Sequence, residues 1–107
     1  MKAEFISVYI VAPKREVART IAQALVEEKL AACVNIIPGA HSIYRWQGKV
    51  ETADEVILIA KSRKGLFDAL EKRAKQLHPY ECPCIVAWPI AAGHGPYLEW
   101  IARETEQ

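Results

Sequence analysis

The chain has 107 residues, of which 51% are hydrophobic and 25% are charged, as is typical of one ordinary soluble globular domain. The 14 lysine and arginine residues against 13 aspartate and glutamate residues give a net charge of +1, so neither nucleic acid nor an anionic membrane is indicated as a partner. The first apolar run, Phe5 to Ala12, is too short to span a membrane and lacks a cleavage pattern, so we expect a cytoplasmic protein. The three cysteines are too few for a disulfide framework and leave at least one free thiol or metal ligand.

The first predicted strand covers Phe5 to Val11, where β-branched and aromatic residues dominate, and it stops before Pro13. Its nearly continuous apolar sequence predicts burial on both faces, or nearly so. A helix follows, because the next segment has an apolar stripe at helical spacing that consists of Val17, Ala18, Ile21, Ala22 and Leu25.

Two extended runs, Ala32 to Trp46 and Lys49 to Lys61, flank Gln47-Gly48, whose glycine provides the positive φ of a tight hairpin turn. At about 3.3 Å per residue these arms measure roughly 40 to 50 Å, whereas a compact chain of this length is about 34 Å across. The hairpin must therefore protrude from the domain. We expect Pro38-Gly39 to bend or bulge its first arm.

The protruding tip, Ile43 to Val50, carries Tyr44 and Trp46 on one face. A lone two-stranded tip with large aromatic side chains is marginally stable in water. We therefore expect a second subunit to cover it.

Ser62 is the expected N-cap of a second helix that ends before Pro79 and has a helical repeat formed by Leu66, Leu70, Arg73, Ala74 and Leu77. A fourth strand covers Cys84 to Trp88. A short helix then begins near Pro96 and is expected to bury Tyr97, Leu98 and Ile101.

This β-α-β-β-α-β order with an added C-terminal helix predicts an α+β, ferredoxin-like fold, in which two helices cover one face of an antiparallel sheet. No repeat, low-complexity tract or linker interrupts the sequence, so we treat residues 1–107 as a single domain. RNA-binding domains share this order, but they need aromatic residues in the third strand, and Val50 to Lys61 contains none.

The segment His78-Pro79-Tyr80-Glu81-Cys82-Pro83-Cys84 is the only place in the sequence where soft metal ligands gather. Its prolines stiffen the backbone, and Cys82 and Cys84 would leave the same face of the strand that follows. His78, Cys82 and Cys84 are therefore candidate ligands for a soft metal ion. The alternative is that His78 caps the preceding helix and that the thiols serve as small core hydrophobes.

Five segments in sequence order resemble the CutA divalent-cation tolerance family: Ala31–Gly39, Ser42–Lys49, Lys61, His78–Tyr80 and Tyr97–Ile101. The resemblance covers nearly the whole chain. It implies a ferredoxin-like subunit in a tight homotrimer, similar in architecture to the PII signalling proteins and linked to tolerance of copper and other divalent metals. The protruding hairpin is an independent reason to expect a trimer.

The copper ligands described for some members of the family do not transfer intact. Those members have a cysteine in the first strand and two adjacent histidines before Pro-Tyr, and the corresponding residues here are Ile10, Leu77 and His78. In many members of the family this chain resembles, an aliphatic residue stands at the position of Cys82 and a glutamate at the position of Cys84. Imidazole and thiolate are ligands that monovalent copper or zinc prefers, so a replacement site for a copper or zinc ion is our hypothesis.

A second group of residues is a candidate pocket or interface between subunits: Tyr44, Arg45, Trp46, Glu51, Lys61 and Tyr80. A pocket of this kind could receive a small anion, but an interfacial ion pair explains a lysine and a glutamate equally well. Cys33, which lies inside an apolar strand, is expected to be a buried structural thiol rather than a reactive one.

The predicted function is that of a non-enzymatic homotrimer in divalent metal tolerance or response, binding copper or another soft metal ion. The alternative is a PII-like signalling or scaffolding trimer that binds a small metabolite or a partner protein. An enzyme is not expected, because a Cys–His pair needs a group that orients the base and an oxyanion stabiliser. No glycine-rich or helix-start loop follows Cys82 or Cys84 to supply the latter.

Overall fold

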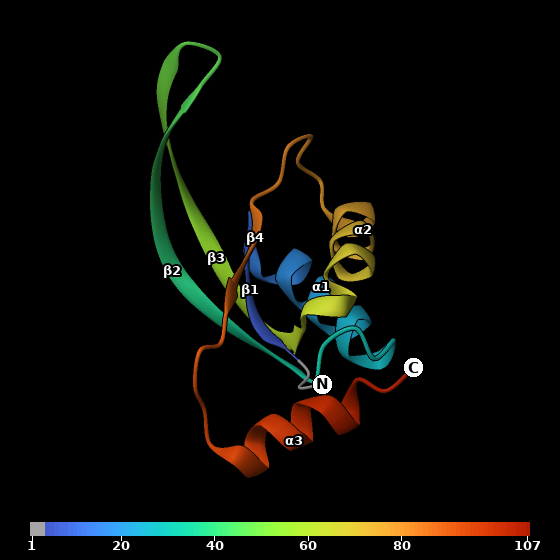
Figure 1. The fold of residues 1–107 in the computed structure, drawn as a ribbon. Coiled ribbons are helices and arrows are strands. Elements are labelled where there is room, and N and C mark those ends of the chain that lie inside the picture. The colour runs from blue at the N-terminus through green and yellow to red at the C-terminus, as the bar shows by residue number, and fades with distance from the viewer. Residues whose placement is uncertain (1–3) are drawn as a thin grey trace.

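The computed structural model describes residues 4–107, which form four strands, three α-helices and one 3-10 turn (Figure 1). In chain order these are β1 Phe5–Ala12, α1 Arg15–Glu27, β2 Cys33–Trp46, β3 Lys49–Arg63, the turn Lys64–Leu66, α2 Phe67–Leu77, β4 Ile85–Pro89 and α3 Gly95–Glu104. The predicted α+β, ferredoxin-like order with a C-terminal helix is confirmed.

The four strands form one antiparallel sheet in the order β2-β3-β1-β4. The central strands are β3 and β1, and β2 and β4 are the two edges. Helices α1 and α2 lie side by side on one face, and α3 crosses the end of the sheet where β1 begins (Figure 1). The opposite face of the sheet, which we call the open face, is covered by none of the three described helices (Figure 1).

Burial along β1 alternates, because the helices cover only one side of it. Ile6, Val8 and Ile10 are buried under α1 and α2, whereas Tyr9 and Val11 are partly exposed on the open face. The prediction that both faces of this strand are buried is therefore wrong for the single chain.

The β2–β3 hairpin protrudes as predicted and gives the molecule its length of 46 Å against 25 and 23 Å in the other directions (Figure 1). Gln47 and Gly48 form its turn with φ of 50° and 80°, the left-handed pair that a two-residue hairpin loop requires. A bulge lies between Ile37 and Ala40, where Gly39 has φ of 90°. The expected irregularity at Pro38-Gly39 is thus present.

Ser62 is not a helix N-cap. It lies in β3 opposite Ile6, and its buried hydroxyl donates to the carbonyl oxygen of Leu30 at 2.6 Å. The strand continues beyond Lys61 because β1 still offers hydrogen-bonding partners there, and α2 begins only at Phe67.

Helix α3 is held to the rest of the fold at its C-terminal end. Ile101 is fully buried as predicted, and the Arg63 guanidinium donates to the Thr105 hydroxyl oxygen at 2.9 Å and to its carbonyl oxygen at 2.7 Å. The prediction for Tyr97 is wrong, since its ring is exposed at the start of the helix. Leu98 is only partly buried.

Candidate metal and ligand site

His78 follows the last residue of α2 and directs its ring back toward β1. Its Nε2 lies 2.7 Å from the carbonyl oxygen of Val11, and its Nδ1 lies 3.1 Å from the backbone nitrogen of Tyr80. A carbonyl can only accept and an amide N–H can only donate, so the ring is neutral with its proton on Nε2. Because the residue is only 8% exposed and both ring nitrogens are engaged, His78 is a structural link between the 78–84 segment and the sheet.

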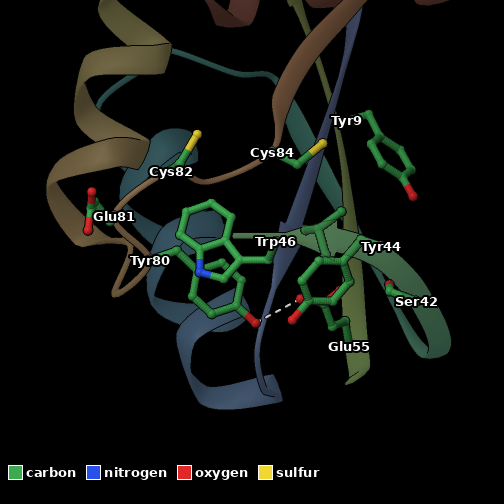
Figure 2. A pocket seen from close by; sticks show the side chains of 10 residues that line it. Tyr9, Ser42, Tyr44, Trp46, Glu55, Tyr80, Glu81, Cys82 and Cys84 are labelled. Carbon is green, nitrogen blue, oxygen red and sulfur yellow. Dashed lines mark hydrogen bonds between the residues drawn. The ribbon is translucent and has the colours of Figure 1, made fainter. Parts of the chain in front are cut away.

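Tyr80 forms a second link between this segment and the sheet. Its hydroxyl donates to Oε2 of Glu55 at 2.7 Å, as Figure 2 shows. Glu55 lies on β3 and is 8% exposed. Burial of the phenol, and then the hydrogen bond and negative charge of Glu55, raise the pKa of Tyr80 to about 12.

A hollow of about 560 Å³ lies between the 78–84 segment and the open face, beside the part of the hairpin near its turn. Its lining is mostly apolar and consists of Tyr9, Val11, Ser42, Tyr44, Trp46, Glu55, Tyr80, Glu81, Cys82 and Cys84. Figure 2 shows the rings of Tyr44, Trp46 and Tyr80 gathered around Glu55. An apolar hollow with a few polar groups is the usual character of a small-molecule site.

The two thiols of the segment both line this hollow, and both are free and exposed. Cys82 lies in the loop and Cys84 immediately precedes β4, where its carbonyl oxygen accepts from the N–H of Val11 at 3.3 Å. Burial of its thiol, and then the charge of Glu55, raise the pKa of Cys84 above its ordinary value. The interpretation of these thiols as core hydrophobes is wrong, because neither lies in the core.

His78 does not point into the hollow with the thiols. Within residues 4–107, no cluster of three or more histidine, cysteine, aspartate or glutamate side chains is arranged to hold a metal ion. The histidine would have to give up one of its two internal hydrogen bonds to become a ligand. A site built from His78, Cys82 and Cys84 together therefore does not fit this arrangement of the single chain.

Residues 6–104 match the protein family described as CutA1 divalent ion tolerance protein. The chain belongs to this family. The divalent-cation tolerance protein CutA of Thermus thermophilus is 56% identical over 98 residues, which are 92% of this chain and 95% of that protein. A solved structure of the divalent cation tolerance protein from Thermus thermophilus has a TM-score of 0.93 at 54% identity and covers 95% of this chain and 99% of its own. CutA1 from Oryza sativa has a TM-score of 0.94 at 44% identity, with 97% and 95% covered.

Some CutA relatives are longer than this chain. The chloroplastic CutA 1 of Oryza sativa is 45% identical over 95% of this chain, which spans only 58% of that protein. The human CutA protein is 43% identical over 92% of this chain, which spans 55% of that protein. No helix among the described residues of this CutA1-family chain is long and apolar enough to cross a membrane.

The residues expected to form an inter-subunit pocket are only partly together in this CutA1-family subunit. The register pairs Tyr44 with Glu51 on the open face, and Trp46 and Tyr80 line the same hollow. Arg45 pairs with Val50 and therefore lies on the opposite face of the hairpin. Alternation along the strand separates it from the aromatic side chains.

Lys61 lies far from the hollow, near the other end of β3. It is six residues from Glu55, or about 20 Å along the strand, and its ammonium donates to the side-chain oxygen of Asn35.

The residue that sequence reasoning missed is Glu55. A carboxylate directly before the apolar run Val56 to Ala60 was a signal, because Glu55 shares the open face with Ile57 by alternation along β3, but no local pattern shows that Tyr80 would be its partner.

Cys33, at the start of β2, is partly buried and links that strand to α3. Its Sγ lies 3.3 Å from the Tyr97 hydroxyl. This hydrogen bond, and then burial, raise the pKa of Tyr97 to about 12. The contact supports the structural role expected for Cys33, although the thiol is less buried than predicted.

Proposed function

We propose that this chain acts without chemical turnover as a homotrimer in tolerance of divalent metals, with copper as the principal metal. The role in metal tolerance is supported by relatives such as the Thermus thermophilus protein, which is named for tolerance of divalent cations and matches nearly the whole chain. The assembly is supported by one observation in the fold, the apolar surface of the hairpin and the open face.

The hairpin tip carries exposed apolar side chains on both sides. Tyr44 and Trp46 lie on the open face, while Ile43 and Val50, exposed by 68% and 63%, lie on the opposite side. A two-stranded ribbon cannot bury large apolar side chains on either of its faces by itself. Because the tip stands beyond its own domain, other copies of the chain are the simplest cover for it.

The open face offers a surface that is different from the tip. Ile37 and Val86 are exposed on it, and Trp88 is 51% exposed on the edge strand β4. A contact between two different surfaces of identical chains is head-to-tail, and such contacts form a ring when the rotation between neighbouring copies closes. The family resemblance makes three the expected number of copies. Each subunit would then cover a neighbour's tip.

The absence of turnover is proposed from the chemistry of the hollow. The neutral His78 has both ring nitrogens in hydrogen bonds to the backbone, so it has no free nitrogen with which to activate a thiol. A nucleophilic cysteine needs a base or a lowered pKa, and the pKa of Cys84 is instead raised.

A PII-like sensor or scaffold that binds a small metabolite or a partner protein is the second candidate function. The hollow of about 560 Å³ favours it, because aromatic walls and one buried carboxylate suit a small organic molecule. A cytoplasmic location is proposed for either function. Reduced thiols such as Cys82 and Cys84 persist in that compartment, although relatives named chloroplastic and periplasmic exist.

A copper challenge tests the proposed function. Bacteria that lack their own CutA-family gene are grown at raised copper with the wild-type chain, with Tyr44→Ala/Trp46→Ala, or with Lys72→Ala, which changes an exposed residue of α2. We expect wild type and Lys72→Ala to restore growth and the tip variant to fail. Equal growth of all three strains and the empty control would contradict the proposal.

A further inference from the structure

We propose that Cys82 and Cys84 alone bind one monovalent copper ion per chain, with His78 outside the ligand set. This inference rests on the proposed function in metal tolerance and names the site and the oxidation state of the metal. It is carried by three features: the engaged histidine, the pair of free thiols on one hollow and, among the described residues, the lack of a third ligand nearby.

The engaged histidine removes the nitrogen ligand that the sequence offered. The ring of His78 packs beside the ring of Tyr80, with ring centroids 4.8 Å apart. Its two nitrogens are hydrogen-bonded to the backbone of Val11 and Tyr80. Binding a metal through either nitrogen would remove the hydrogen-bond partner of a partly buried backbone carbonyl or amide group. Loss of a hydrogen-bond partner destabilises such a group, so the ring favours its present contacts.

The two thiols are available without any such cost. Both are exposed, neither is in a disulfide, and Figure 2 shows both beside the indole of Trp46. Residues i and i+2 have Cα atoms at most about 7.6 Å apart, so rotation about χ1 can direct both sulfurs to one ion. Pro83 between them fixes its own φ and restricts Cys82, which lowers the entropy lost on binding.

The number of available protein ligands indicates which metal ion the site suits. In the part of the chain that the structure describes, no third histidine, cysteine, aspartate or glutamate joins the two thiols in a metal-binding cluster. Zinc in structural sites takes four ligands, and calcium and magnesium take oxygen ligands. Monovalent copper prefers soft thiolates and is stable with only two of them.

Competition with a coloured copper(I) chelator of known affinity tests the site. The full-length, reduced, metal-free protein is titrated without oxygen, with ascorbate to keep copper monovalent. We expect one copper(I) per chain and at least a 100-fold weaker affinity in Cys82→Ser and in Cys84→Ser. Cys33→Ser is the matched control, because it removes the third thiol elsewhere in the fold, and it should bind as wild type does.

X-ray absorption of the copper-loaded wild type identifies the ligands without a His78 variant, whose folding the substitution would compromise. Sulfur neighbours alone are expected. An imidazole nitrogen bound to the copper, or unchanged affinity in both serine variants, would overturn the two-thiolate site, as would zinc bound as tightly as copper(I). Sedimentation of the same samples distinguishes failure of the copper(I) site from failure of the proposed homotrimer. A trimer that fails to bind copper(I) refutes this site alone, whereas a monomer refutes the proposed assembly.

Discussion

The Nε2 of His78 lies 2.7 Å from the carbonyl oxygen of Val11, and this contact joins the end of α2 to β1 across 67 residues of sequence. Because Tyr80 donates its backbone N–H to the other ring nitrogen, a single side chain holds the start of the 78–84 segment. The position of the two thiols on the hollow depends on this link.

Replacement of His78 should therefore destabilise the protein. His78→Ala removes two hydrogen bonds and leaves the partly buried Val11 carbonyl without its His78 partner, so we expect a loss of about 2 to 3 kcal/mol in the free energy of unfolding. Chemical denaturation at one fixed protein concentration measures it. His94→Ala, at an exposed histidine before α3, is the control and should change stability by less than about 0.5 kcal/mol. Equal effects of the two changes would show that the His78 contacts do not matter.

The Tyr80–Glu55 hydrogen bond should make stability depend on alkaline pH. The pKa of Tyr80 is raised from 10.0 to about 12 in the folded state, so folding favours the protonated phenol. This contribution is fully present below pH 10 and is lost as the pH rises from 10 through 12. The stability difference between wild type and Tyr80→Phe should shrink over that range. A difference that stays constant with pH would contradict the assignment.

The charge of Glu55 should also slow the reaction of Cys84 with alkylating agents. Burial is the larger cause of the raised pKa of this thiol, and Glu55 is the second. Glu55→Gln should thus lower the pKa part of the way and move the pH profile of iodoacetamide labelling to lower pH. Labelling is followed by mass spectrometry in a Cys82→Ser background, with the exposed Glu51→Gln as control. An identical profile in both variants would refute the influence of Glu55.

The aromatic side chains of the tip should control assembly. Tyr44→Ala together with Trp46→Ala should dissociate or unfold the protein at micromolar concentration, since large aromatic residues in a desolvated interface contribute about 2 kcal/mol or more each. Sedimentation velocity measures the outcome. Lys72→Ala should sediment as the wild type does, and a tip variant that also does so would remove the tip from the interface.

The sequence allowed the elements and the protruding hairpin to be predicted because their signals are local. The helical repeat at Ile21 and Leu25 and the positive φ required at Gly48 need no knowledge of the rest of the chain. The end of β3 was not predictable in this way. Ser62 stays in the strand because Ile6 pairs with it from the other end of the chain.

The candidate site was predicted less well, for the same physical reason. The histidine and the thiols are neighbours in sequence, but the partner of His78 is Val11, and that contact decides which ligands stay free. Tyr44 and Trp46 share the face of Glu55 only because the bulge at Gly39 shifts β2 by one residue against β3. Contacts between distant segments, which no local pattern encodes, therefore define the site.

Native mass spectrometry of untagged protein, purified without chelators, is the most direct test of a metal-tolerance homotrimer, because it reports the number of chains and the bound metal together. We predict the mass of three 12.0 kDa chains with copper bound. A folded monomer without metal at micromolar concentration would contradict the account.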